Sequence, residues 1–385
     1  MTKPWRCLFW VQSLLGSGHL RRALLLAEAF AARGAEVTLA NGGAPGPWAP
    51  APGVRMVQLR SITARDADFS ELVDASGGPV APVVRSERQR LLAQLLERRP
   101  HAIVTEMFPF GRRAFRGELV PLLEAARSHH PSPLVVASVR DVLVSKPDPS
   151  RYRWMVETCL AHYDRVLVHG DERLLPFAAS FPPAAELGSR IVHTGFIRER
   201  AEPVRDLPAP AVLISAGGGA VGQRLLRAAV AARPLTRYAS APWLLVGGQN
   251  LPAAAFAAIQ ETLPAGCALE RYRADLPALI GRCEVSVSQA GYNTVVEGLS
   301  AGARMVLVPF AAGVEDEQEQ RARRLVELGL AQLVAESELS AELLAQAIDR
   351  AGATARPRAA GWSFDGAARS AAIVERLVRE RFGDA

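Results

Sequence analysis

The chain of 385 residues contains only four cysteines, and they are far apart. Cys7, Cys159, Cys267 and Cys283 form no CxxC pair. This spacing excludes a zinc site of the usual kind and a disulfide framework. Thiols that are few and scattered suit a reducing compartment, so we expect the protein in the cytoplasm.

Long hydrophobic runs and lysine are also scarce. No run of about 18 apolar residues occurs, which excludes a membrane-spanning helix. The apolar N-terminal run is interrupted at Gln12 and Ser13 and has no cleavage site of small residues, so it predicts a buried strand rather than a signal peptide. Lys3 and Lys146 are the only lysines, and the arginines behind the net charge of +6 are dispersed. Dispersed arginines indicate solvated helix faces, and we expect no nucleic-acid partner.

Short apolar runs alternate with amphipathic segments along both halves of the chain. In the first half we expect strands at 5–11, 36–40, 54–59, 101–105, 133–139 and 164–168, and helices at 18–33 and 115–128. In the second half we expect strands at 211–216, 243–248, 267–270, 285–288 and 305–309, and helices at 220–232, 253–262, 292–301 and 317–329. Continuous apolar strands are typical of parallel sheets covered on both faces, so the pattern predicts an α/β fold.

A Pro-rich stretch at 202–211 interrupts this alternation and predicts a linker. It would separate an N-terminal domain at 1–201 from a C-terminal domain at 212–362, each a doubly wound, Rossmann-like βα unit. The segment 363–385 has apolar residues at helical spacing and is expected to pack back across the domains. The two domains would face each other across a cleft that receives the carboxyl ends of their strands.

The first βα turn contains Gly16, Ser17 and Gly18 and is followed by His19. The glycines allow a ligand to approach the backbone. A helix N-terminus disfavours imidazolium, so His19 would stay neutral and could serve as a base. The alternative is that the glycines only tighten the turn and that His19 packs or caps the helix.

Other polar residues follow strands of the same domain and should point at the same edge. They are Glu106, Arg140, Asp141, His169 and Asp171. Asp141 or Glu106 could orient His19, although structural ion pairs with nearby arginines would explain these residues equally well.

The loop after the strand at 101–105 combines aromatic and basic residues: Phe108, Phe110, Phe115, Arg112 and Arg113. Such interleaving suits an amphiphilic acceptor or a membrane interface. The alternative interpretation places one or two of the phenylalanines in the core and the arginines in water.

A second Gly-rich turn opens the C-terminal domain. Gly217, Gly218 and Gly219 follow a strand and precede a helix, an arrangement that can cradle a diphosphate. The spacing up to Gly222 also matches GxGxxG. However, the next strand ends at Gln249 without the acidic residue of a dinucleotide site, so a nicotinamide or flavin enzyme is disfavoured.

The stretch 285–331 carries the most information. Gly291 permits a tight turn, Asn293 and Thr294 begin a helix whose free amides can meet phosphate, and Glu297 lies one turn later on about the same face. Glu317 and Gln318 start the next helix, where they could reach a sugar ring. An N-capped core helix followed by a solvated acidic helix start is the alternative.

The segments GSGHLRR, AGGGAVG, SQAGYNTVVEGLSAG and EDEQEQRARRL together resemble the family 28 glycosyltransferases, which have the GT-B fold. The resemblance covers nearly the whole chain, and residues 285–331 are its specific part. It is strongest toward a bacterial group of predicted glycosyltransferases. The family includes the enzyme that adds N-acetylglucosamine to the lipid precursor of peptidoglycan.

This resemblance implies a hexose transfer from a UDP-sugar, N-acetylglucosamine first among the sugars, by inverting displacement without metal or other cofactor. It implies that His19 is the base, that Glu297 binds the ribose and that Gln318 touches the sugar. The other implied donor-binding positions are Gly291, Asn293 and Thr294 at the diphosphate and the backbone of Tyr272 and Arg273 at uracil. Many relatives have other residues at Gln289 and Ala290, which leaves the sugar and the phosphate contacts open.

Several alternatives remain open. The start of the chain also resembles a nucleotide-sugar hydrolase of the same fold, so a hydrolase, a 2-epimerase or a non-catalytic nucleotide-sugar-binding protein would fit too. Asp66-Ala67-Asp68 is the one DxD string, and we interpret it as solvated surface rather than a metal site. The acceptor is undefined, and a peripheral contact with the inner face of the membrane stays open.

Overall fold

The computed structural model describes residues 4–16, 18–65, 71–146, 148–199, 209–217, 222–310, 316–358 and 361–383. The chain divides into two compact units. The N-terminal unit contains residues 1–198 and 365–385, and the C-terminal unit contains residues 199–364. Of the predicted linker, residues 202–208 lie outside the described part.

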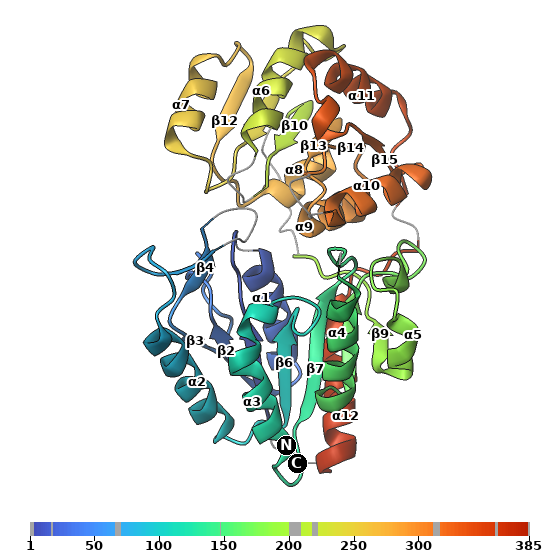
Figure 1. The fold of residues 1–385 in the computed structure, drawn as a ribbon. Helices are drawn as coiled ribbons and strands as arrows, with labels where there is room; N and C mark the ends of the chain where they lie inside the picture. Colours follow the sequence, from blue (N-terminus) through green and yellow to red (C-terminus); the bar gives the residue numbers. More distant parts are fainter. Residues whose placement is uncertain are drawn as a thin grey trace. The chain divides into compact units, whose positions relative to one another are not determined.

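The N-terminal unit is built on a seven-stranded parallel sheet in the order β3-β2-β1-β6-β7-β8-β9 (Figure 1). Its strands are β1 (Trp5–Val11), β2 (Ala35–Asn41), β3 (Val54–Gln58), β6 (Ala102–Glu106), β7 (Leu134–Arg140), β8 (Arg165–His169) and β9 (Ile191–His193). A separate antiparallel pair, β4 (Ile62–Ala64) and β5 (Leu72–Asp74), follows β3.

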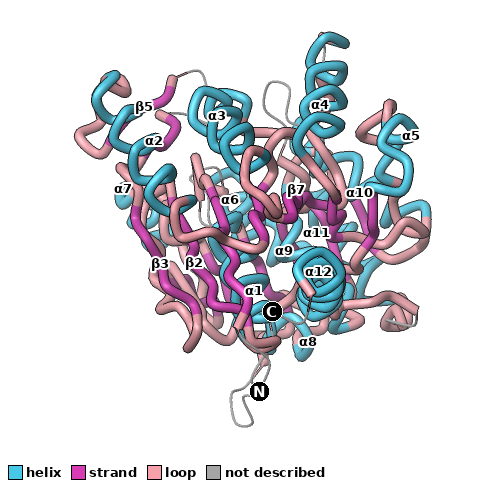
Figure 2. Tube along the Cα trace, turned by 90° about the horizontal axis from the view of Figure 1, so that it is seen from below, coloured by secondary structure: helices cyan, strands magenta, loops and turns pink. Residues whose placement is uncertain are grey.

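Helices cover both faces of this sheet, and Figure 2 shows the two layers. One layer contains α1 (Gly18–Ala31) and α12 (Gly366–Phe382), whose apolar residues share a core with the sheet. The other contains α2 (Pro82–Leu96), α3 (Arg116–Arg127) and α4 (Pro149–His162), and the short α5 (Ala184–Leu187) follows β8. The C-terminal helix α12 thus returns to the N-terminal unit, where it packs on α1 and β7.

The C-terminal unit repeats the plan with six parallel strands in the order β12-β11-β10-β13-β14-β15. The strands are β10 (Val212–Ser215), β11 (Trp243–Val246), β12 (Cys267–Glu270), β13 (Val285–Ser288), β14 (Met305–Leu307) and β15 (Ala331–Leu333). The helices are α6 (Gln223–Ala232), α7 (Ala253–Glu261), α8 (Leu276–Arg282), α9 (Tyr292–Ala301), α10 (Glu317–Glu327) and α11 (Ala341–Ala353).

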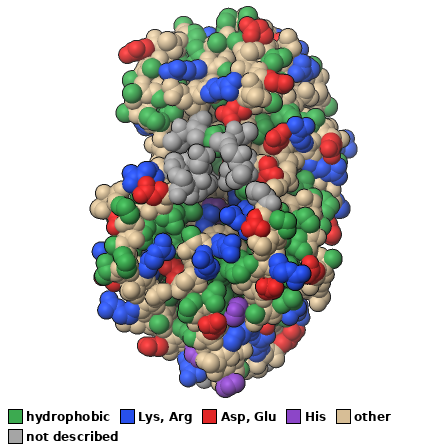
Figure 3. Space-filling view, viewed as in Figure 1, with side chains coloured by type: hydrophobic (Ala, Val, Ile, Leu, Met, Phe, Trp, Pro, Cys, Tyr) green, Lys and Arg blue, Asp and Glu red, His purple; other side chains and the backbone are tan. Residues whose placement is uncertain are grey.

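The predicted α/β class with two doubly wound units is confirmed. The strands and helices expected from the sequence are present with small shifts at their ends. The elements that were not predicted are α2, α4, α5, α8 and α11, the antiparallel pair β4 and β5, and the edge strands β9 and β15. No helix in the described ranges is long and apolar enough to cross a membrane. On the face drawn in Figure 3, basic and acidic side chains are intermingled over both units, as their dispersal in the sequence suggested.

Each sheet has one point where the strand order reverses. It lies between β1 and β6 in the N-terminal unit and between β10 and β13 in the C-terminal unit. At such a point the connections leave in opposite directions, so a crevice opens beyond the carboxyl ends of the two strands. The residues after β1, β6, β10 and β13 are therefore the ones to examine for function.

A buried ion pair fixes the chain where β1 ends. The guanidinium of Arg88, on α2, donates to both carboxylate oxygens of Glu118 at 2.8 and 2.7 Å and to Oε1 of Gln12 at 2.8 Å. Trp10 Nε1 also donates to Glu118, at 3.1 Å. Gly42 is required beside this pair, because a Cβ there would overlap the Gln12 amide and the Arg88 guanidinium.

Replacing Arg88 with Ala should destabilise the protein strongly, because the Glu118 carboxylate would stay buried without its counter-ion. Breaking such a buried pair costs about 3–5 kcal/mol of unfolding free energy. The exposed Arg90 on the same helix is the matched control, and Arg90→Ala should change stability by less than about 0.5 kcal/mol. Urea unfolding of the three proteins measures the difference, and equal losses for the two variants would contradict this role of Arg88.

Candidate active site

His19 meets the carboxylate of Glu106 at the strand-order reversal of the N-terminal unit. Glu106 is the last residue of β6, and His19 lies in the first turn of α1, after β1. Nδ1 of His19 is 3.1 Å from Oε1 of Glu106. Arg22, one turn further along α1, donates to the same carboxylate oxygen and lies 3.1 Å from Nδ1 of His19. Pairing of β1 with β6 therefore brings together residues that are 87 positions apart.

A chain of buried hydrogen bonds continues from Glu106 across the neighbouring strands. Ser138 Oγ, on β7, donates to Oε2 of Glu106 at 2.6 Å and lies 2.9 Å from Nε2 of His169, at the end of β8. Nδ1 of His169 is 2.9 Å from Oγ1 of Thr194, which follows β9. Ser138, His169 and Thr194 are all buried.

The positions of the protons in this series of hydrogen bonds can be assigned from Glu106 outward. The single Ser138 proton goes to the carboxylate, so the Ser138 oxygen accepts from Nε2–H of His169. A neutral His169 then accepts from the Thr194 hydroxyl at Nδ1. Burial lowers the pKa of His169 to about 3, which keeps it neutral. Every donor in the chain therefore points toward Glu106.

The charges at the site favour an ionised Glu106 beside a neutral His19. Burial by itself would raise the pKa of Glu106, but Arg22, His19 and Ser138 outweigh it and hold that pKa well below its usual value. Burial and the charge of Arg112 lower the pKa of His19 well below its ordinary value. With Nδ1–H donated to the carboxylate, Nε2 of His19 keeps a lone pair. The His19 side chain is 14% exposed, so a substrate can reach it.

Arg112 and Arg140 lie near this pair, since the charge of each lowers the pKa of His19. Arg112 has a left-handed backbone, with φ of 59°, and its Nε donates to the carbonyl of Gln12 at 2.7 Å. Asp141 is buried, and its Oδ1 accepts from the backbone N–H of Val142 at 2.9 Å. Of the two acids that were candidates to orient His19, the structure brings Glu106 to it.

The aromatic loop is arranged differently from the prediction. Phe108, Phe110 and Phe115 are all buried in the core and present no apolar surface to an acceptor or a membrane. Phe110 packs edge-on against Phe177 and Phe181, because the loop after β6 folds inward over the sheet end. Arg113 lies over the ring of Trp154 at 5.3 Å. The apolar acceptor surface expected from these rings is therefore wrong.

The first glycine turn leaves room beside its backbone. Gly16 has a φ of 64°, and a Cβ placed there would meet no atom within 4 Å. Gly18 begins α1, and Ser17 lies outside the described residues.

In the C-terminal unit, the ends of β10 and β13 lie side by side. Gly217, after β10, has a φ of 69°, and a Cβ there would approach Oε1 of Gln289, after β13, to 3.3 Å. The predicted cradle residues Gly218 and Gly219 lie outside the described part.

Among the described residues, no side chain caps the N-terminus of α9. Gly291 is the N-cap residue, it provides no side-chain cap, and a Cβ there would meet nothing within 4 Å. Asn293 and Thr294 in the first turn are half-buried, and their side chains make no hydrogen bond to any described residue. Uncapped amides at a helix start favour an anion.

A buried arginine that the sequence analysis did not single out supports this turn. Arg321, on α10, is 1% exposed, and its Nη1 donates to the carbonyl of Ala290 at 2.7 Å. Its guanidinium lies over the Tyr292 ring at 6.0 Å. Arg321 thereby fixes both residues that flank Gly291. Its place in a run of charged residues gave no sign of this burial.

Glu297 lies one turn into α9, half-buried. Its carboxylate makes no hydrogen bond or ion pair to the residues that the structure describes. Burial, with a smaller contribution from Glu199, raises the pKa of Glu297 to about 8. A carboxyl group in this state has acceptor capacity that a ligand hydroxyl can use.

The remaining predicted donor-side residues lie at two other strand ends. Oε1 of Gln318 accepts from the backbone N–H of Phe310 at 3.1 Å, so this oxygen is committed to the chain after β14. Glu317, at the start of α10, is buried. After β12, Tyr272 is 51% exposed, and Arg273 forms a bidentate pair with Asp275 at 2.7 and 2.6 Å.

Metal ligands do not gather in the described part of the chain, where no group of three or more His, Cys, Asp or Glu could hold an ion. Asp66-Ala67-Asp68 lies outside it.

Part of the C-terminal unit matches the model of a known protein family. Residues 218–360 match the glycosyltransferase family 28 C-terminal domain. The match contains the Gly291 turn, Glu297, Arg321 and the start of α10.

The chain is also similar to curated and structurally characterised proteins. It is 26% identical to the UDP-N-acetylglucosamine–N-acetylmuramyl-(pentapeptide) pyrophosphoryl-undecaprenol N-acetylglucosamine transferase of Xanthomonas campestris pv. campestris strain 8004, over 86% of this chain and 71% of that protein. The crystal structure of Acinetobacter baumannii MurG matches with a TM-score of 0.57 and 18% identity over 97% of this chain and 100% of that one. A UDP-glucosyltransferase of Polygonum tinctorium matches with a TM-score of 0.63 and 14% identity over 99% of both chains.

At these identities the structural matches establish the fold, which is that of GT-B glycosyltransferases. The resemblance seen in the sequence motifs is thus confirmed by an independent family match. Residues 218–360 thus match the glycosyltransferase family 28 C-terminal domain, and the whole chain has the GT-B fold and is similar to glycosyltransferases.

Proposed function

We propose that the protein transfers a hexose, N-acetylglucosamine first among the candidates, from a UDP-sugar to a hydroxyl group of an acceptor. The observation that carries this proposal is the accessible, neutral His19 held against the carboxylate of Glu106. The N-acetylglucosamine transferase of Xanthomonas, which matches most of the chain, supports the choice of donor.

The C-terminal unit supplies the donor contacts in this proposal. The uncapped amides at Gly291, Asn293 and Thr294 would receive the diphosphate, because a helix start attracts negative charge. Glu297, one turn behind them, would accept hydrogen bonds from the ribose hydroxyls. Backbone at Tyr272 and Arg273 would hold uracil, and Gln318 the sugar, as the family resemblance implies.

The N-terminal unit supplies the base. Nε2 of His19 takes the proton of the acceptor hydroxyl while the acceptor oxygen forms a bond to the anomeric carbon. The bond from that carbon to the UDP oxygen breaks on the opposite side, so the configuration inverts. Glu106 stabilises the imidazolium that forms, and the helix N-terminus at Gly291 stabilises the departing diphosphate. No step in this scheme needs a metal ion.

The acceptor is bound in this scheme near His19, where Arg22, Arg112 and Arg140 lie. The undecaprenol-linked substrate named for the Xanthomonas relative supports a lipid-linked acceptor at the inner face of the membrane.

A nucleotide-sugar hydrolase is the second candidate, because the same His19–Glu106 pair would activate water equally well. Incubating the protein with UDP-N-acetylglucosamine and no acceptor separates the two functions. A transferase should release UDP only as a slow leak, and adding its acceptor should raise the rate. Rapid release in water alone would identify a hydrolase, and absence of UDP binding would contradict both.

Replacing His19 with Ala should lower the rate of UDP release on the order of 10²–10⁴-fold, because that is the usual contribution of a general base. UDP affinity should be unchanged, since the nucleotide contacts belong to the other unit. His129→Ala, a partly exposed histidine elsewhere in the unit, is the control and should keep the native rate. A folded His19→Ala protein that retains more than about a tenth of the rate would exclude His19 as the base.

Glu106→Gln should slow the reaction at least about tenfold and shift its pH profile. Only neutral His19 is active, so the native rate rises with pH through a His19 pKa that lies below the ordinary value. The carboxylate raises that pKa, so its loss should move the rising limb to lower pH. An unchanged limb position in a folded variant would argue against the contact between Glu106 and His19.

Glu297→Gln should weaken UDP binding by about 1–3 kcal/mol. It should also abolish the release of protons that accompanies UDP binding. The free carboxyl has a pKa of about 8, and hydrogen bonds from ribose favour its charged form, so binding at pH 7 should release protons and tighten as the pH rises toward 8. Calorimetry in two buffers of different ionisation enthalpy counts these protons. Equal proton release by the native protein and the variant would remove Glu297 from the ribose site.

UDP release should continue in excess EDTA, because helix amides and not a divalent ion are assigned to the leaving group. The rate with EDTA is compared with the rate after added Mg²⁺ or Mn²⁺. A complete loss that either ion restores would show that the phosphate site requires a metal.

A further inference from the structure

A pocket of about 380 Å³ lies at the amino ends of β1, β2 and β3 in the N-terminal unit. These are the strand ends opposite to His19, so the pocket is separate from the candidate active site. The end of α2 forms one wall through Leu95, and Arg98 follows that helix.

Thr38 and Arg55 lie beside Leu8 in the floor of this pocket, where a helix-covered sheet would normally present only apolar residues. Leu8, Thr38 and Arg55 are adjacent in register across the three strands, so their side chains lie on one face. Arg6 and Glu36 are paired in the same way two residues earlier. This part of the sheet face is therefore open to solvent and charged.

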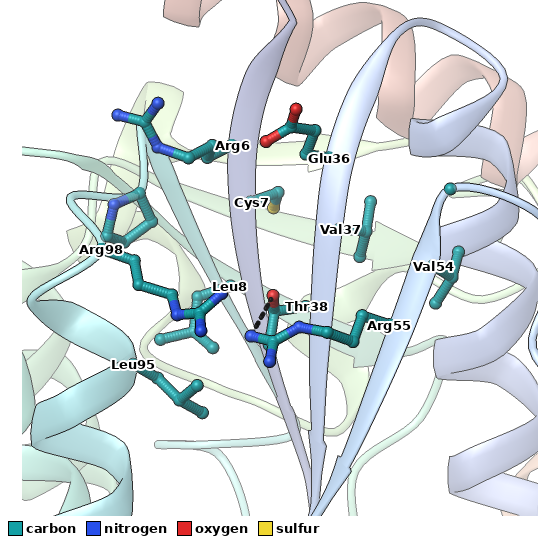
Figure 4. Close-up of a pocket in the computed structure, with 12 residues that line it drawn as sticks. Arg6, Cys7, Leu8, Glu36, Val37, Thr38, Val54, Arg55, Leu95 and Arg98 are labelled. Atoms are coloured by element: carbon teal, nitrogen blue, oxygen red, sulfur yellow. Dashed lines mark hydrogen bonds between the residues drawn. The ribbon is translucent and has the colours of Figure 1, made fainter.

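Three guanidinium groups line the pocket, those of Arg6, Arg55 and Arg98. Figure 4 shows Arg55 and Arg98 extending toward each other from opposite sides over the floor. Arg55 Nη2 donates to Thr38 Oγ1 at 3.1 Å, and Arg6 donates to the carbonyl of Arg99 at 3.2 and 3.0 Å. Within the described ranges none of the three forms an ion pair with a carboxylate.

The charges around the pocket do not balance. Glu36 is the one acid among the lining residues, so three positive charges meet one negative charge. Two guanidinium groups that face each other repel, and an anion between them removes that repulsion. The planar fork of arginine also matches the oxygens of a phosphate group in pairs.

We propose that this pocket binds a phosphomonoester whose dianion sits between Arg55 and Arg98. Its two negative charges equal the excess positive charge of the lining residues. The volume lies within the usual range for small-molecule sites, about 300–1,000 Å³, and exceeds the needs of phosphate alone. The remaining space, bordered by Leu8 and Leu95, accommodates an organic body of sugar size. This proposal is independent of the one made for the catalytic site.

Calorimetry of the full chain with glucose 6-phosphate, at constant ionic strength, tests the site. The phosphate ester should bind and uncharged glucose should not. Arg55→Ala and Arg98→Ala should each weaken binding at least tenfold, and Arg98→Lys should fall between, because it keeps the charge and loses the fork. Arg376→Ala, which removes an exposed guanidinium on α12, is the matched control and should bind like the native protein.

Three results would overturn the proposal. They are no binding of glucose 6-phosphate to the native protein, binding of glucose 6-phosphate by the Arg55 and Arg98 variants as tight as by the native protein, or binding of glucose as tight as that of glucose 6-phosphate. The four substitutions are at three exposed positions, 55, 98 and 376, so circular dichroism should show native folding. Flotation with vesicles that contain phosphatidic acid identifies the source of the phosphate. Vesicle binding that requires Arg55 and Arg98 assigns the site to a lipid headgroup, and its absence beside binding of glucose 6-phosphate assigns it to a free metabolite.

Discussion

The carboxylate of Glu106 has to remain charged where almost no water reaches it, and much of the N-terminal unit is arranged around that requirement. An isolated buried carboxylate costs several kcal/mol, and it would take up a proton instead. Arg22 supplies the opposite charge, and His19 and Ser138 supply donors. His169 donates to the Ser138 oxygen and accepts from Thr194, which leaves the Ser138 proton for Glu106. The chain of donors therefore converts a costly buried charge into a fixed partner for one imidazole nitrogen.

The C-terminal unit solves a different electrostatic problem with the same topology. Its strand-order reversal also places two strand ends side by side, but backbone amides at Gly291 replace the charged side chains. Amides at a helix start cannot be titrated, so their attraction for an anion does not depend on pH. The ionisable groups are set behind them: Arg321 below the turn, and Glu297 one helical turn away.

Local sequence patterns predicted the parts of the fold that depend on periodicity. The central strands are continuous apolar runs, and α1, α9 and α10 follow glycine-rich or polar starts, so they were found with small errors. Helix α2 was missed because its sequence carries charged residues on most sides and only a weak apolar stripe. The edge strands β9 and β15 have three residues each, too few for a periodic pattern.

The site was predictable to the level of strand ends and no further. His19, Glu106 and Asp141 were candidates for the catalytic site because each follows or ends a predicted strand. Which acid contacts His19, however, depends on how β1 pairs with β6. The phenylalanine loop was misjudged for a related reason. Alternating aromatic and basic residues look alike whether a loop lies flat on the surface or turns its rings inward, and contacts with Phe177 and Phe181, distant in sequence, decide the outcome.

The near absence of lysine fits the use that the interior makes of arginine. Arg88 holds Glu118, Gln12 and two backbone carbonyls at once, and Arg321 spans the Ala290 carbonyl and the Tyr292 ring. A lysine ammonium is a point charge and could not occupy several fixed directions in one plane. The buried guanidinium groups, together with the glycines, therefore determine the course of the turns after β1 and β13.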